Sequence, residues 1–172
     1  MVLNGLDPKV LWQHFDKIRT IPHCSGNEEQ LAEYLLSYSK KKDLEAEKDE
    51  NGNVIIRVPA TPGHEDAPTV VLQGHMDMVG EKDSDVDHDF FKDPIEVELD
   101  GDWVKAKGTT LGADNGIGMA AALAVIDSPD MVHGPLELLF TVDEEVGLTG
   151  AGKLEPGFVK GSMMLNLDTE EL

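Results

Sequence analysis

The chain has 172 residues, and 40% of them are hydrophobic, which is enough to bury the core of one domain. Thirty-four acidic residues against fourteen basic ones leave a formal charge of −20, which repels phosphate backbones and anionic lipid surfaces and so argues against nucleic acid or a membrane as partner. Cys24, the single cysteine, rules out an internal disulfide framework. The sequence shows neither a membrane-length apolar run nor a secretion signal, so we expect a cytoplasmic protein.

Helical spacing of apolar residues predicts two amphipathic helices near the amino terminus. The first is expected to have Asp7 as its N-cap and Pro8 as its first helical residue, and to end near residues 21–22. The second is expected to be capped within residues 25–27 and to end at the lysines 40–42, which favour the carboxyl end of a helix dipole. Both helices are expected to cover a sheet.

Two hairpins are predicted from strand-like runs that flank turn residues. Residues 44–48 and 54–58 lie on either side of Asn51-Gly52, which is a favourable turn pair. Residues 95–107 form a similar pattern around an Asp-Gly pair. An acidic loop at 80–94 precedes this second hairpin.

Continuous apolar runs, typical of strands buried on both faces, occur at residues 69–72, 136–142 and 162–167. A helix of small residues is predicted at 119–126. Alternation of buried strands and helices predicts an α/β fold: a largely parallel mixed sheet with helices on both faces and antiparallel hairpins at an edge.

Chemically active side chains directly follow the buried strands. In chain order they are His75 and Asp77 after the first strand, Asp114 at the helix start after a glycine-rich turn, Glu144 and Glu145 after the second strand, and Asp168 after the third. Ligands of α/β sheets bind outside the carboxyl ends of the strands, so we expect these groups to converge. Converging carboxylates repel one another unless a proton or a cation intervenes. One imidazole among carboxylates suits Zn²⁺, with Mn²⁺ or Co²⁺ as possible substitutes, better than it suits Ca²⁺.

Each of these signals also has an ordinary structural explanation. A histidine at a strand end is commonly just hydrogen-bonded, Asp114 occupies the place of a helix N-cap, and residues 143–145 could form a solvated acidic turn. The combination favours chemistry, because one of two adjacent glutamates can bind metal while the other accepts a proton from water. Asp77 is close enough in sequence to orient the imidazole of His75.

Four motifs carry a family resemblance. They are G-H-M-D-M-V at 74–79, G-T-T-L-G-A-D-N-G-I-G at 108–118, T-V-D-E-E-V-G at 141–147 and L-N-L-D-T-E-E at 165–171. In order, spacing and strand context they resemble the co-catalytic zinc exopeptidases of the M20 type. The opening I-P-H-C-S-G-N-E-E-Q-L-A-E-Y-L is also similar, and the resemblance is closest to the bacterial Xaa-His (aminoacyl-histidine, carnosinase-like) dipeptidases of this family.

The resemblance implies a fold, a two-zinc site and individual residue roles. It makes Asp114 the carboxylate that bridges two metals, His75 and Asp168 the further ligands of one metal, Glu145 the ligand of the other, Glu144 the general base, and Asp77 the partner that orients His75. It also implies that the peptide bond between Asp114 and Asn115 is cis.

The resemblance further implies parts that residues 1–172 do not contain. The family supplies one more histidine ligand from a later segment, beyond a lid domain that commonly mediates dimerisation. We therefore expect this chain to be the amino-terminal part of the catalytic domain, inactive alone, of a homodimeric enzyme that hydrolyses small peptides. A tripeptidase or an N-acyl amino-acid deacylase with the same site remains an alternative, and so does a non-catalytic metal-binding module.

Overall fold

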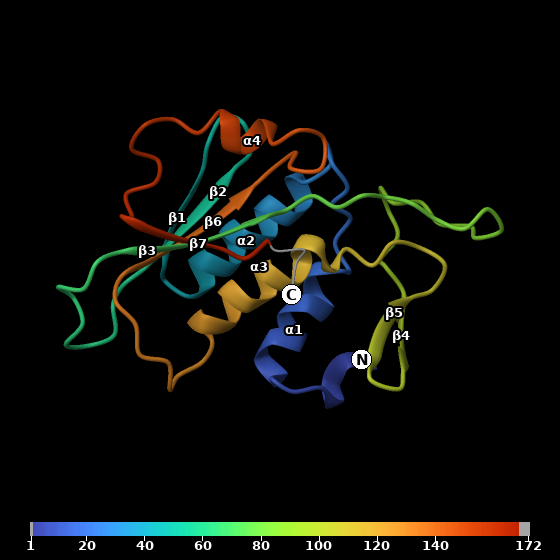
Figure 1. The fold of residues 1–172 in the computed structure, drawn as a ribbon, viewed down its shortest axis with the longest axis horizontal. Coiled ribbons are helices and arrows are strands. Elements are labelled where there is room, and N and C mark those ends of the chain that lie inside the picture. Colours follow the sequence, from blue (N-terminus) through green and yellow to red (C-terminus); the bar gives the residue numbers. More distant parts are fainter. Residues whose placement is uncertain (1, 169–172) are drawn as a thin grey trace.

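A five-stranded sheet forms the centre of the molecule in the computed structural model, which describes residues 2–168 (Figure 1). Its order is β1-β2-β6-β3-β7, with bounds β1 Glu45–Lys48, β2 Val54–Val58, β6 Leu136–Thr141, β3 Val70–His75 and β7 Met163–Asn166. Strands β6, β3 and β7 run parallel, whereas β1 pairs antiparallel with β2 and β2 antiparallel with β6. The mixed α/β sheet is confirmed, and the first hairpin forms its antiparallel edge next to β6, as expected.

Helices α2 Glu29–Lys41 and α3 Ala113–Ile126 pack against one face of this sheet (Figure 1). Helix α1 Lys9–Ile18, which was also expected to cover the sheet, packs mainly on α3 on the same side. A short 3₁₀ helix, η1 Val2–Gly5, precedes α1, and a one-turn helix, α4 Thr149–Gly152, follows β6. Ala151 of α4 lies near Leu139, on the sheet face opposite to α3. Helices therefore lie on both faces, although the second face has only α4 among the described residues.

Alternate residues of the buried strands pack into two separate clusters. Ile56 and Leu138 belong to the large core between the sheet and the three helices. Their neighbours Ile55, Val71 and Leu139 point the other way and pack against the segment that follows α4. Both faces of these strands are apolar for this reason, which explains the continuous apolar runs in the sequence.

The two helix caps differ from the sequence-based expectation. Pro8, not Asp7, is the N-cap of α1, because Pro8 has an extended backbone (ψ 127°) and its carbonyl accepts the hydrogen bond of Trp12. Helix α2 begins after Glu28, because a turn closed by the hydrogen bond from Asn27 N–H to the Cys24 carbonyl comes first. The side chain of Ser25 is thus not a helix cap and is available for another contact.

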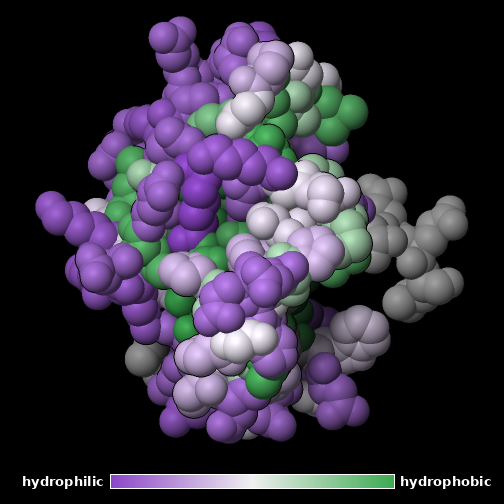
Figure 2. All heavy atoms as spheres, turned by 90° about the vertical axis from the view of Figure 1, so that its left-hand side faces the viewer, coloured by the Kyte–Doolittle hydropathy of each residue, from purple (hydrophilic) through white to green (hydrophobic). Residues whose placement is uncertain are grey.

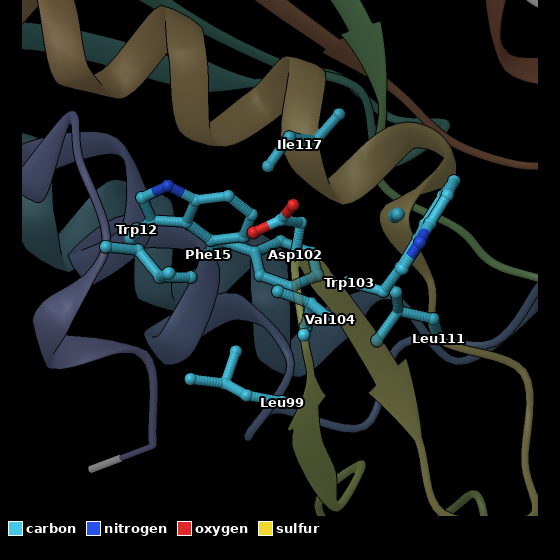
Figure 3. Close-up of a pocket in the computed structure, with 11 residues that line it drawn as sticks. Trp12, Phe15, Leu99, Asp102, Trp103, Val104, Leu111 and Ile117 are labelled. Atoms are coloured by element: carbon cyan, nitrogen blue, oxygen red, sulfur yellow. The ribbon is translucent and has the colours of Figure 1, made fainter.

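The second hairpin forms a separate two-stranded sheet, β4 Val97–Asp100 with β5 Trp103–Ala106, so its expected place at the edge of the main sheet was wrong. The 80–94 loop carries it away from β3 and beside α1 (Figure 1). Figure 3 shows the apolar pocket of about 390 Å³ between the hairpin, α1 and the start of α3, with Trp12, Trp103 and Ile117 in its lining. None of the six predicted site residues lines this pocket.

The exterior agrees with the acidic composition. The face shown in Figure 2 is mainly hydrophilic, with smaller apolar areas between the polar side chains. Within residues 2–168, every helix is too short or too polar to cross a membrane.

Candidate metal centre

His75 is the buried centre of the site. It ends β3 and is only 1% exposed. Its Nδ1 lies 2.9 Å from the backbone carbonyl oxygen of Asp77, which can only accept, so Nδ1–H is the donor and Nε2 faces the carboxylates. Nε2 is 3.0 Å from Oδ1 of Asp114. The ring is therefore fixed on one side and directed at an acidic cluster on the other.

Further carboxylates from two other elements approach the same nitrogen. Oδ1 of Asp168, after β7, lies 3.8 Å from Nε2 of His75, and Oε2 of Glu144, after β6, lies 3.9 Å away. Ligand atoms of His75, Asp114 and Asp168 lie within 4.8 Å of one another, as do those of His75, Glu144 and Glu145. One imidazole and several carboxylates in this spacing match the donors that Zn²⁺ takes in proteins, so the residues fit the metal that the sequence implies.

The electrostatics of the cluster show an excess of negative charge. Burial lowers the pKa of His75, but the hydrogen bond and charge of Asp77 and the nearby Asp114 outweigh burial and raise this pKa to about 9. Burial and the neighbouring carboxylates also raise the pKa of Glu144 and that of Glu145. A cation in the cluster would relieve the same repulsion that a proton on His75 relieves here.

Asp77 holds the backbone of the acidic turn. Its buried carboxylate accepts hydrogen bonds from the N–H groups of Glu144 (2.9 Å, to Oδ1) and Glu145 (3.1 Å, to Oδ2). The hydroxyl of Ser25 donates to the same carboxylate at 2.7 Å. Oδ1 also lies 3.4 Å from Nδ1 of His75, farther than the carbonyl oxygen of Asp77. Burial raises the pKa of Asp77, but the interaction with His75 and the hydrogen bonds from Ser25 and the two N–H groups outweigh burial and lower this pKa.

The start of α3 presents Asp114 to His75. Gly112, in the left-handed conformation, precedes the helix, and Asp114 and Asn115 do not have helical backbone angles. The peptide bond between them is cis, as the resemblance implies. The side-chain amide of Asn115 donates to the carbonyl of Leu167 (3.0 Å) and contacts Oδ1 of Asp168 (3.4 Å), which links α3 to the end of β7.

Residues 71–167 match the peptidase family M20/M25/M40. The chain belongs to this family. Because the matched range contains the four sequence motifs except part of the last, the family assignment and the geometry refer to the same residues.

Two relatives of this M20-family chain that are more than 50% identical to it are named as dipeptidases. It is 53% identical over 169 residues to the cytosol non-specific dipeptidase of Escherichia coli (strain K12), a match that covers 98% of this chain and 35% of the relative. The crystal structure of aminoacylhistidine dipeptidase from Vibrio alginolyticus superposes with a TM-score of 0.96 at 54% identity, covering 99% of this chain and 35% of that one. A tripeptidase from Staphylococcus aureus (TM-score 0.77, 24% identity, 94% and 43% coverage) shows the same fold. The M20-family chain thus spans about a third of the length of its two similar relatives.

The four predicted metal ligands of the M20-family chain do not all lie in one group of ligand atoms. His75 is common to both groups of ligand atoms, but among residues 2–168 no such group contains both Asp114 and Glu145. The role of Asp114 as a bridge between two metals therefore stays a prediction. The end of the fourth motif, residues 169–171, lies outside the described residues.

Sequence reasoning missed three side chains at this site: Ser25, Glu28 and Asn115. Ser25 was read as a helix cap, and nothing in the sequence separates Glu28 from its exposed neighbour Glu29. For Asn115 the sequence did contain a signal, namely the glycines around it, which indicate close packing. The structure shows this packing, because a Cβ atom at Gly118 would lie 2.6 Å from Oδ1 of Asn115.

Proposed function

We propose that this site binds Zn²⁺ and, in a protein of its relatives' length, hydrolyses the peptide bond of short peptides, in particular Xaa-His dipeptides. The observation that carries the proposal is the convergence of a buried imidazole with carboxylates that follow β6 and β7 and open α3. The names of the Escherichia coli and Vibrio alginolyticus relatives support dipeptides as the substrate class. The name of the first also supports a cytoplasmic location.

His75, Asp114 and Asp168 would hold one ion, and Glu145 would contribute to a second, with Asp114 shared between the two. When bound, zinc supplies Lewis acidity, which polarises a carbonyl group and makes water more acidic. Mn²⁺ and Co²⁺ prefer similar donors and are possible substitutes.

Glu144 is the proposed general base. Its carboxylate reaches the cluster but is farther from His75 than that of Asp114, and its pKa is raised by burial and by neighbouring carboxylates. A raised carboxyl pKa makes the group a better proton acceptor near neutral pH. Glu144 would take the proton of the attacking water at Oε2 and pass it to the leaving amine, while Asp77 keeps its backbone in place.

The chain alone is proposed to be inactive, since it spans about a third of the relatives' length. A later segment would add another histidine ligand, and a lid domain would close the site and form a homodimer. On this proposal, residues 1–172 are the amino-terminal part of the catalytic domain.

A chimera tests the proposal. Residues 1–172 replace the matching third of the Escherichia coli relative, and the chimera and the 172-residue chain are assayed with Xaa-His dipeptides, tripeptides and N-acetyl amino acids. We expect the chimera to hydrolyse dipeptides in a manner abolished by a chelator and restored by Zn²⁺, and the chain alone to be inactive. The Glu144→Gln chimera is the control for contaminating peptidase.

Each alternative has its own outcome in this assay. Preference of the chimera for tripeptides or acylated amino acids would replace the proposed substrate class. A folded chimera that binds zinc without hydrolysing any of these compounds would identify a metal-binding module and reject the enzymatic proposal.

A further inference from the structure

Three consecutive backbone N–H groups of the acidic turn are held by two carboxylates from elsewhere in the chain. Asp143 donates to Oε1 of Glu28 at 3.1 Å. Glu144 and Glu145 donate to the two oxygens of Asp77 at 2.9 and 3.1 Å. The turn that carries the proposed base and ligand is thus anchored through its backbone, which leaves both glutamate side chains free to face His75.

The segment 23–28 contributes at both ends of this anchorage. Glu28 holds the first N–H group directly, and the hydroxyl of Ser25 donates to Oδ2 of Asp77 at 2.7 Å. The segment is itself attached to the end of β3, because the N–H of Met78 donates to the carbonyl of His23 at 3.2 Å. Two side chains three positions apart therefore contact the turn and the residue that supports it.

The Glu28 carboxylate also accepts from the backbone N–H groups of Gly26 and of Glu28 itself, so it joins the 26–28 segment to the acidic turn. Glu28 is the N-cap residue of α2, yet its side chain makes no capping hydrogen bond and is directed to Asp143 instead. Glu28 is 6% exposed and Asp77 is 1% exposed, so water cannot easily replace a lost partner. Hydrogen bonds to buried ionisable groups are among those whose loss costs most.

We propose that Ser25 and Glu28 are positioning residues that hold the 143–145 turn so that Glu144 and Glu145 face the metal site. Neither residue is proposed to touch metal or substrate. The role of these two residues in catalysis rests on the proposed function. The hydrogen bonds that hold residues 143–145 do not depend on it.

Backbone amide exchange of the metal-free 172-residue chain, followed by NMR, tests the anchorage. Glu28→Ala should accelerate exchange at Asp143 by about 10-fold or more, because a partly buried donor loses its acceptor. Glu28→Gln should restore slow exchange, since its amide oxygen can accept the same hydrogen bond. Glu29→Ala, at an exposed glutamate paired with Lys48, is the matched control and should change nothing in the turn.

Parallel variants test Ser25. Ser25→Ala should accelerate amide exchange at Glu144 and Glu145. Ser25→Thr, which keeps a hydroxyl, should restore slow exchange. Amides of β6 report the stability of the whole chain and should be unaffected. If Glu28→Ala does not fold, Glu28→Asp replaces it, because the carboxylate remains but is one methylene too short to reach Asp143.

Zinc affinity of the same variants, measured by calorimetry, separates positioning from simple stabilisation. Ser25→Ala and Glu28→Ala should weaken zinc binding about 10-fold, with rescue by Ser25→Thr and Glu28→Gln. Unchanged exchange at 143–145 in both alanine variants would overturn the proposal, and so would faster exchange with unchanged zinc affinity. A parent chain that binds no zinc would count against the proposed function, and the exchange rates alone would then decide whether the anchorage exists.

Discussion

Nε2 of His75 lies 3.0 Å from Oδ1 of Asp114, although the two residues are 39 positions apart in the chain. The end of β3 and the start of α3 meet at this contact. Since Asp168 and Glu144 also approach the same nitrogen, a positive charge is needed here, either as a proton on the imidazole or as a metal ion.

Zinc should stabilise the 172-residue chain against heat. Binding to the folded state alone adds about 2.7 kcal/mol at a hundredfold excess over Kd. Calorimetry or circular dichroism should show a higher Tm with Zn²⁺, and His75→Ala and Asp168→Asn should each remove most of the increase. His64→Ala, at an exposed histidine outside the cluster, is the control. Equal increases in all four proteins would mean that zinc binds somewhere else.

The metal-free chain should lose stability between about pH 6.5 and pH 9 through His75. Its pKa is raised from 6.5 to about 9 in the folded state, so the folded state binds more protons than the unfolded state in this range. A pKa raised by folding stabilises the folded state fully at pH values below the pKa of the unfolded state. This stabilisation is lost as the pH rises through the pKa of the folded state. Urea unfolding of the parent and of His75→Asn across this range checks the prediction: the variant should show a smaller decline with pH. An equal decline in both proteins would assign the effect to other groups.

Much of the fold follows from local patterns. The hairpin at Asn51-Gly52 and the buried strands β6 and β7 lie within one residue of their expected bounds, because turn chemistry and apolar runs are local signals. Strand β3 was expected at 69–72 but continues three residues further, to His75. The separate place of the β4–β5 hairpin was not predictable, because it depends on how the 80–94 loop packs and not on the hairpin's own sequence.

The sequence predicted those site residues whose positions follow from the ends of the strands. His75 and Asp168 could be placed together because strand ends share one edge of a sheet, and Asp114 was added because it opens a helix after a glycine-rich turn. Ser25 and Glu28 could not, since their contacts with Asp77 and Asp143 span 52 and 115 positions, and a serine before a helix is usually a cap.

Gly118→Ala should destabilise the chain although alanine is the better helix former. A Cβ atom there would lie 2.6 Å from Oδ1 of Asn115 and 2.8 Å from the carbonyl oxygen of Leu167. Overpacking of this kind costs about 1–3 kcal/mol, which exceeds the gain of up to about 1 kcal/mol from helix propensity. Denaturant unfolding measures the difference. Gly152→Ala, in α4 with open space around the added methyl group, should be neutral or slightly stabilising, and a similar loss in both variants would refute the steric explanation.

The last prediction separates the two adjacent glutamates, which have the same chemistry and differ only in their surroundings. In the chimera, Glu144→Gln should remove the proton acceptor while the side chain keeps its shape and the metal ligands remain. A general base contributes about 10² to 10⁴ in rate, so kcat should fall by at least the lower value with zinc content and KM nearly unchanged. Zinc content by atomic emission and steady-state kinetics on the same preparations give both quantities.

Glu145→Gln should behave differently, because an amide is a much weaker ligand than a carboxylate. Its zinc content should fall, and part of the lost activity should return at high Zn²⁺ or Mn²⁺. The opposite pattern, with zinc lost from Glu144→Gln and kept by Glu145→Gln, would exchange the two roles. Since Asp77 holds both backbone N–H groups in the parent, neither substitution should alter the turn itself, and slow amide exchange at 144 and 145 in both variants checks that each effect comes from the side chain. Full zinc content and near-normal kcat in both variants would mean that residues 143–145 are only a solvated acidic turn, and the proposed mechanism would then be wrong.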